Sequence, residues 1–157
     1  MKLSAKARHV QGTLRALGLD AHVVKLAEST RTATEAASAV GCTVGQIVKS
    51  LVFRAGEGPV LVLASGTNFV DEERLSSVAG TPIRRARADF VRQHTGYSIG
   101  GVAPVGHPRP IPTIVDEDLL QYNEVWAAAG GPFTVFACSP DFLATLGKVA
   151  CVKRGGG

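Results

Sequence analysis

Two features of this sequence could do chemistry, and the first is a lysine inside an apolar segment. Lys49 lies in the segment 47–53, IVKSLVF, which is rich in residues that favour β-strands. Because successive side chains of a strand point to opposite faces, Lys49 points away from the face that carries Val48 and Ser50. Its ammonium group lies either on a solvated face of a sheet or in a cleft, where it would bind a phosphate or a developing negative charge.

The second feature is the stretch 96–106, GYSIGGVAPVG, which contains too much glycine for regular secondary structure. Its central part is a loop made of Gly100, Gly101, Val102, Ala103 and Pro104. The backbone N–H groups of such a loop can approach a ligand without obstruction and bind a carbonyl oxygen as it gains charge. The same composition is equally typical of a tight turn that binds nothing.

Two further sets of polar residues have both a structural and a functional interpretation. Asp116 follows an apolar strand and precedes a short helix, where an aspartate is most often a helix cap. The cluster of Arg84, Arg85, Arg87 and Arg92 would suit contacts with an RNA backbone. A solvated basic face is the more common reason for such a cluster.

Several common catalytic motifs are missing from the sequence. It has no GxSxG elbow, no HExxH helix and no Walker lysine, and its glycine loop does not match GxGxxG. The four histidines are scattered, and the three cysteines are widely spaced without a CxxC pair. We therefore expect reduced thiols, no metal site and no cofactor.

The composition describes an ordinary globular protein. The chain has 157 residues, of which 45% are hydrophobic and 19% charged, so we expect one domain over residues 1–157. No apolar run approaches the roughly 18 residues that cross a bilayer, and no signal peptide is present, so we expect a cytoplasmic protein without a membrane partner. The net charge of +4 is compatible with a polyanionic partner without requiring one.

The elements that must position these residues follow from periodicity and capping signals. Predicted strands cover 21–24, 47–53, 60–64, a short stretch near 83, 113–115, 125–128, 133–137 and 149–153, and the second and third are expected to form a hairpin. Predicted helices cover 4–17, 32–41, 71–78, 88–94, 116–120 and 139–147, and 155–157 is a loose tail. Because crossover helices do not regularly separate the strands, the pattern predicts an α+β fold with a mixed sheet and helices around it.

These features, in this order, resemble the YbaK/ProX family of free-standing aminoacyl-tRNA editing deacylases and the related editing domain of prolyl-tRNA synthetase. The resemblance extends from about residue 29 to residue 152. The segments that carry it are QIVKSLVF at 46–53, Gly96-Tyr97, Gly100 to Pro104 with Gly106, Ile114-Val115-Asp116 and Ala129-Gly130-Gly131.

The resemblance implies a mixed, partly barrel-like β-sheet with flanking helices. It also implies hydrolysis, without a metal, of the ester that joins an incorrect amino acid to the 3′ adenosine of tRNA, commonly proline tRNA. Lys49 would be the key catalytic residue, and the loop from Gly100 to Pro104 would shape the aminoacyl pocket. Asp116 and Gly130 would lie at the same site. The terminal ribose or a positioned water would act as the general base.

The sequence leaves the substrate and one alternative function open. Ala103 stands where cysteine-clearing members of the family often carry serine, so cysteine, alanine and similar small amino acids all remain candidates. The alternative is a non-catalytic module that binds tRNA or an aminoacyl-adenylate-like ligand and associates with a synthetase. Prolyl-tRNA synthetase is the candidate protein partner, and nothing in the sequence indicates the oligomeric state. The presence of Lys49 favours the enzyme, because a scaffold does not require it.

Overall fold

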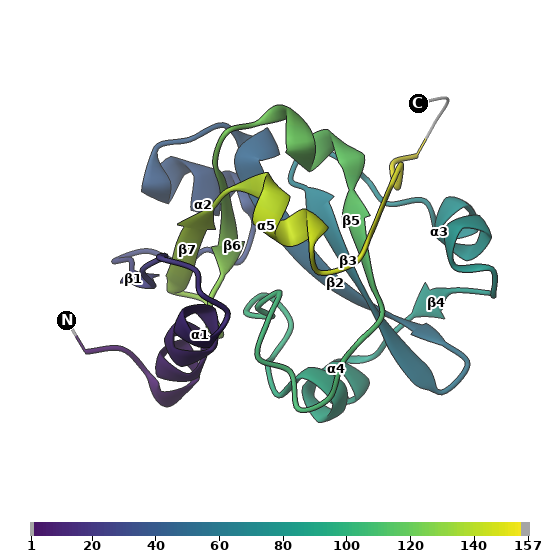
Figure 1. The fold of residues 1–157 in the computed structure, drawn as a ribbon, viewed down its shortest axis with the longest axis horizontal. Helices are drawn as coiled ribbons and strands as arrows, with labels where there is room; N and C mark the ends of the chain where they lie inside the picture. The colour runs from purple at the N-terminus through teal and green to yellow at the C-terminus, as the bar shows by residue number, and fades with distance from the viewer. Residues whose placement is uncertain (1, 155–157) are drawn as a thin grey trace.

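The computed structural model describes residues 2–154 (Figure 1). Its helices are α1 (Ala5–Ala16), α2 (Ala33–Val40), α3 (Glu72–Ala79), α4 (Ala88–Thr95) and α5 (Pro140–Ala144), with 3-10 helices η1 (Val44–Gln46) and η2 (Glu117–Gln121). Its strands are β1 (Val24–Lys25), β2 (Ile47–Ala55), β3 (Gly58–Ser65), β4 (Arg84–Arg85), β5 (Thr113–Asp116), β6 (Val125–Ala128), β7 (Thr134–Cys138) and β8 (Lys148–Ala150). The tail predicted at 155–157 lies outside the described residues.

The strands form one mixed sheet, which confirms the predicted α+β class. Within the described residues the sheet has eight strands in the order β1-β7-β6-β2-β3-β5-β8, and β4 pairs with β2 beside this path. Strand β2 is antiparallel to β3 and parallel to β6, while β5 runs parallel to both β3 and β8. The order ends at β1 and β8 without joining them, so the sheet is not a closed barrel.

The predicted hairpin is confirmed and forms the centre of the sheet. Strand β2 pairs with β3 from Val48 opposite Ser65 to Ala55 opposite Gly58, which places Lys49 opposite Ala64. Gly56 has a φ of 62° in the connecting turn, a conformation that glycine adopts without a steric penalty.

Helices cover both faces of this hairpin (Figure 1). Alternate residues of β3 face opposite sides, so Leu63 packs in a core with helices α1, α4 and α5, whereas Val62 packs in a second core with Leu75 of α3. A smaller cluster joins α2 to Ile47 at the start of β2. Strand β3 is therefore buried on both faces, whereas residues 49–52 of β2 are only partly buried.

The predicted helix caps account for most of the correct boundaries. Ser4 accepts a hydrogen bond from the backbone of α1, and Thr32 forms a capping box with Glu35 at the start of α2. Asp71 caps α3, and Gly96 ends α4 in the left-handed conformation. These signals are local, and each therefore works before any tertiary contact forms.

The predicted strand at 21–24 is largely wrong, and a side chain explains the difference. Gln11 of α1 donates from Nε2 to the carbonyl of Ala21 at 2.8 Å and accepts from the N–H of Val23 at 2.8 Å. This amide thus occupies backbone groups that a neighbouring strand would otherwise bind, and β1 is only Val24–Lys25.

Three other predicted boundaries also differ. The final strand is β8 at Lys148–Ala150, and Lys153 instead forms an isolated bridge with Val70. Helix α5 ends at Ala144, short of Gly147, and the helix predicted after Asp116 is the 3-10 helix η2. In the part of the chain that the structure describes, no helix is long and apolar enough to cross a membrane.

Candidate functional site

The candidate site lies at a short unpaired edge in the middle of the sheet. On the side of β2 away from β3, β6 pairs only with Ile47 and Val48, and β4 pairs only with Phe53 and Arg54. Among the described residues, no strand pairs with this side of β2 at positions 49–52. We call this stretch the β2 gap.

The pairing register shows which backbone groups face the β2 gap. The N–H of Gly66 donates to the carbonyl of Ile47, so the odd-numbered residues of β2 direct their backbone groups toward β3. Because these groups alternate along a strand, the N–H and C=O of Ser50 and of Val52 point to the other side, into the gap. The gap therefore presents backbone donors and acceptors that a ligand can bind.

Two pockets open at the β2 gap, one on each side of a common wall. The larger has a volume of about 320 Å³ and the smaller about 180 Å³. Residues of β2 and of the glycine loop line both pockets, and the shared wall consists of Lys49, Ser50, Leu51, Ile99 and Val102.

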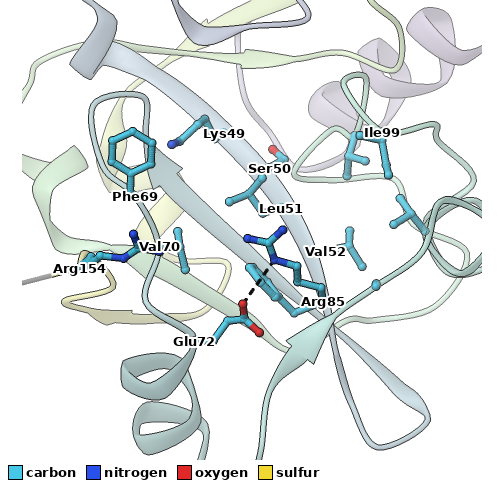
Figure 2. Close-up of a pocket in the computed structure, with 14 residues that line it drawn as sticks. Lys49, Ser50, Leu51, Val52, Phe69, Val70, Glu72, Arg85, Ile99 and Arg154 are labelled. Carbon is cyan, nitrogen blue, oxygen red and sulfur yellow. Dashed lines mark hydrogen bonds and ion pairs between the residues drawn. The ribbon is translucent and has the colours of Figure 1, made fainter.

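The two pockets differ in chemistry. The larger pocket contains an aromatic ring and several charged groups, among them Phe69, Glu72, Arg85 and Arg154 (Figure 2). Arg85 is paired with Glu72 at 3.4 Å, which leaves Arg154 as the more available cation. The smaller pocket is lined mainly by apolar residues, among them Ile47, Trp126, Ala127, Ala128 and Val135, and Thr30 and Arg31 also contribute to its lining.

Lys49 lies where the two pockets meet. Its ammonium group donates a hydrogen bond to the carbonyl of Asn68 and lies 5.6 Å from the centre of the Phe69 ring. Burial lowers the pKa of Lys49 below its ordinary value, and the Asp116 carboxylate partly offsets this effect. The structure thus places the lysine in a cleft rather than on a solvated sheet face.

Asp116 supports the site from behind. The residue is only 1% exposed and lines neither pocket. Its Oδ2 accepts from the Ser65 N–H at 2.9 Å and from Asn68 Nδ2 at 2.7 Å, and its Oδ1 accepts from the Asp118 N–H. The cap interpretation is confirmed by this last bond. The bond from Asn68 fixes that residue, whose carbonyl accepts from Lys49.

The glycine loop contributes to the site unevenly. Gly100 lines the smaller pocket and Val102 lines both, whereas Ala103 and Pro104 are buried and line neither. The carbonyl of Ala103 accepts a hydrogen bond from His107 Nε2 at 2.8 Å. Gly100 has a φ of 89°, so glycine is needed there for its conformation.

Gly101 and Gly130 serve packing in this structure. A Cβ on Gly101 would lie 2.9 Å from the Cα of Gly131, closer than real contacts allow. Gly130 has a φ of 96° in the turn between β6 and β7, and a Cβ there would lie 3.1 Å from the Cβ of Lys6. Neither residue lines the two pockets at the gap. Gly101 lets the glycine loop pack closely against the turn between β6 and β7, and Gly130 lets that turn pack closely against Lys6 of α1.

Sequence reasoning missed several residues that the structure brings to the site. Ser50 lines both pockets, and its buried hydroxyl has no hydrogen-bond partner among the described residues. Asn68 and Phe69 follow the turn at Gly66 and Thr67 that comes after β3, and Ile99 directly precedes the glycine loop. One sequence signal could have indicated them. Phe69 stands in a short connection after a strand, where small polar residues are usual.

Comparison with known proteins identifies the family. The model of the aminoacyl-tRNA editing domain matches residues 27–146. A solved structure described as a candidate trans-editing enzyme for prolyl tRNA synthetase superimposes with a TM-score of 0.93 at 50% identity, covering 98% of this chain and 100% of that one. This chain therefore belongs to the aminoacyl-tRNA editing domain family, as the resemblance in the sequence implied.

Curated relatives agree with this assignment. YwhH of Bacillus subtilis is 29% identical over 122 residues, which cover 77% of this chain and 78% of that protein. EbsC of Enterococcus faecalis, named as a candidate Cys-tRNA(Pro)/Cys-tRNA(Cys) deacylase, is 27% identical over 73% of this chain and 71% of its own. A proline–tRNA ligase of Xanthomonas campestris is 36% identical over 57% of this chain, but the match spans only 16% of the ligase.

Proposed function

We propose that this protein is a trans-editing aminoacyl-tRNA deacylase that hydrolyses the ester of a small amino acid on mischarged tRNA, with proline tRNA as the RNA. The observation that carries the proposal is the meeting of two unlike pockets at Lys49. An aminoacyl-tRNA has its ester between an amino acid and a nucleoside. Because Lys49 lies on the wall between the two pockets, it can act on this ester while the amino acid occupies one pocket and the nucleoside the other.

The smaller pocket suits the amino acid. Its volume of about 180 Å³ and its lining by Ile47, Trp126 and Ala127 favour a short apolar or thiol side chain. A rigid wall excludes larger side chains by steric clash, whereas one methylene more or less within the pocket is worth only about 1–3 kcal/mol. We therefore propose cysteine and alanine as the amino acids removed.

Hydrolysis requires stabilisation of the negative charge that forms on the carbonyl oxygen of the ester. In the proposed mechanism a water attacks the ester carbonyl and gives up a proton, the carbon–oxygen bond to the ribose breaks, and the ribose oxygen takes up that proton. We assign the stabilisation of the oxyanion to two donors, the Lys49 ammonium and the Ser50 N–H, which points into the β2 gap. The terminal ribose hydroxyl or the Ser50 hydroxyl would hold the water.

The test is release of amino acid from proline tRNA charged with cysteine or alanine, followed under multiple turnover. We expect turnover by the wild-type protein and a loss of roughly 100-fold or more in Lys49→Ala, which is typical for removal of one preorganised donor. The control is Lys25→Ala, which removes an exposed lysine of the same charge on β1.

Two outcomes would contradict the proposal. Full activity in Lys49→Ala would remove the lysine from the mechanism. Saturable tRNA binding without any release of amino acid from a panel of mischarged tRNAs would instead show a non-catalytic binding module.

A further inference from the structure

The larger pocket has two apolar side chains at its rim that remain open to solvent. Phe69 is 75% exposed and Ile99 is 63% exposed, and these are the most exposed large hydrophobic residues in the described part of the chain. Both line the larger pocket, on opposite sides of it in Figure 2. Exposed apolar groups that gather around one pocket are typical of a surface that a ligand covers.

The backbone that carries Phe69 is held in place at several points. Asn68 donates from its side chain to Asp116 at 2.7 Å and to Asp118 at 2.9 Å. The carbonyl of Phe69 itself accepts from the N–H of Arg154 at 2.8 Å, and the N–H of Asp71 donates to Val152. The ring is therefore exposed although its backbone is fixed, so a ligand that stacks on it orders little new structure.

Positive groups lie beside the ring. The Lys49 ammonium is 5.6 Å from the ring centre, and Arg154 lines the same side of the pocket (Figure 2). A flat ring next to cations matches a nucleotide, in which an aromatic base is joined to a phosphate. The uncharged side chain of cysteine or alanine would meet these cations without a charge to neutralise them.

We propose that the larger pocket binds the 3′-terminal nucleotide of the tRNA, with its base stacked on Phe69 and its phosphate beside Arg154. The assignment rests on the proposed function, since it places the ester at Lys49 and the amino acid in the smaller pocket. Stacking recognises the face of the base, so Phe69 contributes affinity for the RNA end and does not select the amino acid.

The binding test uses adenosine 5′-monophosphate as the probe and ribose 5-phosphate as its baseless counterpart, each titrated into the full chain and followed by NMR. We expect saturable binding of the nucleotide with shifts in the Phe69 ring signals. Binding should weaken roughly 10-fold or more in Phe69→Ala and persist in Phe69→Trp, which retains a stacking surface. Ribose 5-phosphate should bind more weakly and should not distinguish these variants.

Kinetics on charged tRNA give a second readout. Phe69→Ala should lower kcat/KM by roughly 10-fold for cysteine and alanine alike, mainly through KM. The matched control is Phe133→Ala, which removes another exposed phenylalanine, 42% exposed, outside both pockets. Because the Phe69 ring is exposed, the variant should unfold at the same temperature as the wild type.

The outcomes separate this inference from the proposed function. Unchanged nucleotide binding in Phe69→Ala, or a change only in which amino acid is removed, would overturn the nucleotide site. If the wild type binds the nucleotide at Phe69 but hydrolyses no aminoacyl-tRNA, the proposed function fails and the nucleotide site stands.

Discussion

Two segments line the larger pocket, and they are held in place by different forces. The segment from Asn68 to Asp71 is fixed by charged groups, since Asn68 bonds to two carboxylates and Lys153 pairs with Asp118 at 3.4 Å. The glycine loop on the other side is fixed by close backbone packing at Gly101 and by neutral hydrogen bonds. One side of the site should therefore respond to changes of charge, and the other to changes of volume.

The largest effect is expected from volume on the loop side. Gly101→Val would place a Cβ about 2.9 Å from the backbone of Gly131, which cannot move without disturbing the turn between β6 and β7. The loop must shift instead, and a displacement of about 1 Å near a reacting group can cost roughly 100-fold in rate. Single-turnover deacylation measures the loss, and Gly101→Ala should show a smaller one.

Binding separates this effect from global unfolding. Affinity for uncharged tRNA should persist in Gly101→Val, because it depends mainly on phosphate contacts. Gly12→Ala is the control, since a Cβ there meets no atom within 4 Å. A normal rate in Gly101→Val would show that the position of the loop does not matter for hydrolysis.

A smaller effect, visible in the pH profile, is expected from charge on the other side. Activity that needs protonated Lys49 falls as pH rises through its pKa, which burial has already lowered from the ordinary value. The Asp116 carboxylate raises this pKa, so Asp116→Asn should move the alkaline fall to lower pH. Deacylation rates from pH 6 to pH 10, corrected for uncatalysed hydrolysis, measure the shift.

Asp116→Asn should also destabilise the fold, by about 1–3 kcal/mol, because it weakens buried hydrogen bonds to Ser65 and Asn68. The control is Asp141→Asn, an exposed aspartate in α5. An unchanged alkaline limb in Asp116→Asn would show that Asp116 does not influence the charge on Lys49.

The smallest effect is expected from a neutral hydrogen bond of the loop. The Tyr97 hydroxyl donates to the carbonyl of Val105 at 2.9 Å, and burial raises the pKa of Tyr97 to about 12. Tyr97→Phe should cost about 1–3 kcal/mol of stability and change the deacylation rate by less than about threefold. Its pH profile should match the wild type, because the hydroxyl stays neutral over the range in which Lys49 titrates. A shifted profile would break the distinction between the two sides.

The sequence predicted those parts of the molecule that depend on local signals. The hairpin of β2 and β3, the caps at Ser4, Asp71 and Gly96, and the placement of Lys49 in a strand all depend on neighbouring residues. The site itself depends on contacts between distant segments. The hydrogen bond between Asn68 and Asp116 joins residues 48 positions apart, and no pattern in the sequence predicts it.

The β2 gap could not be predicted from the sequence either, because it consists of the residues of β2 that β4 and β6 leave unpaired. A strand pattern shows that 47–53 pairs with something, but not that its partner on one side stops at Val48 and another begins at Phe53. The segment 21–24 shows the converse case. The sequence predicts a strand there, but the side chain of Gln11 in α1 binds the backbone groups that a strand partner would bind. In each case the deciding contact forms between separate elements of the folded chain, and a local sequence pattern does not specify it.

The β2 gap also affects the tendency of this protein to aggregate. An unpaired strand edge is normally a template on which another chain can add a strand and begin to aggregate. Here the open stretch is bounded at both ends by paired strands, and its four residues span only about 13 Å at the rise of a β-strand. An extended strand from another molecule would collide with β6 or β4 before it formed a stable ladder. A small ligand fits between them, so the chain keeps backbone hydrogen-bonding groups open to a substrate while denying them to its neighbours.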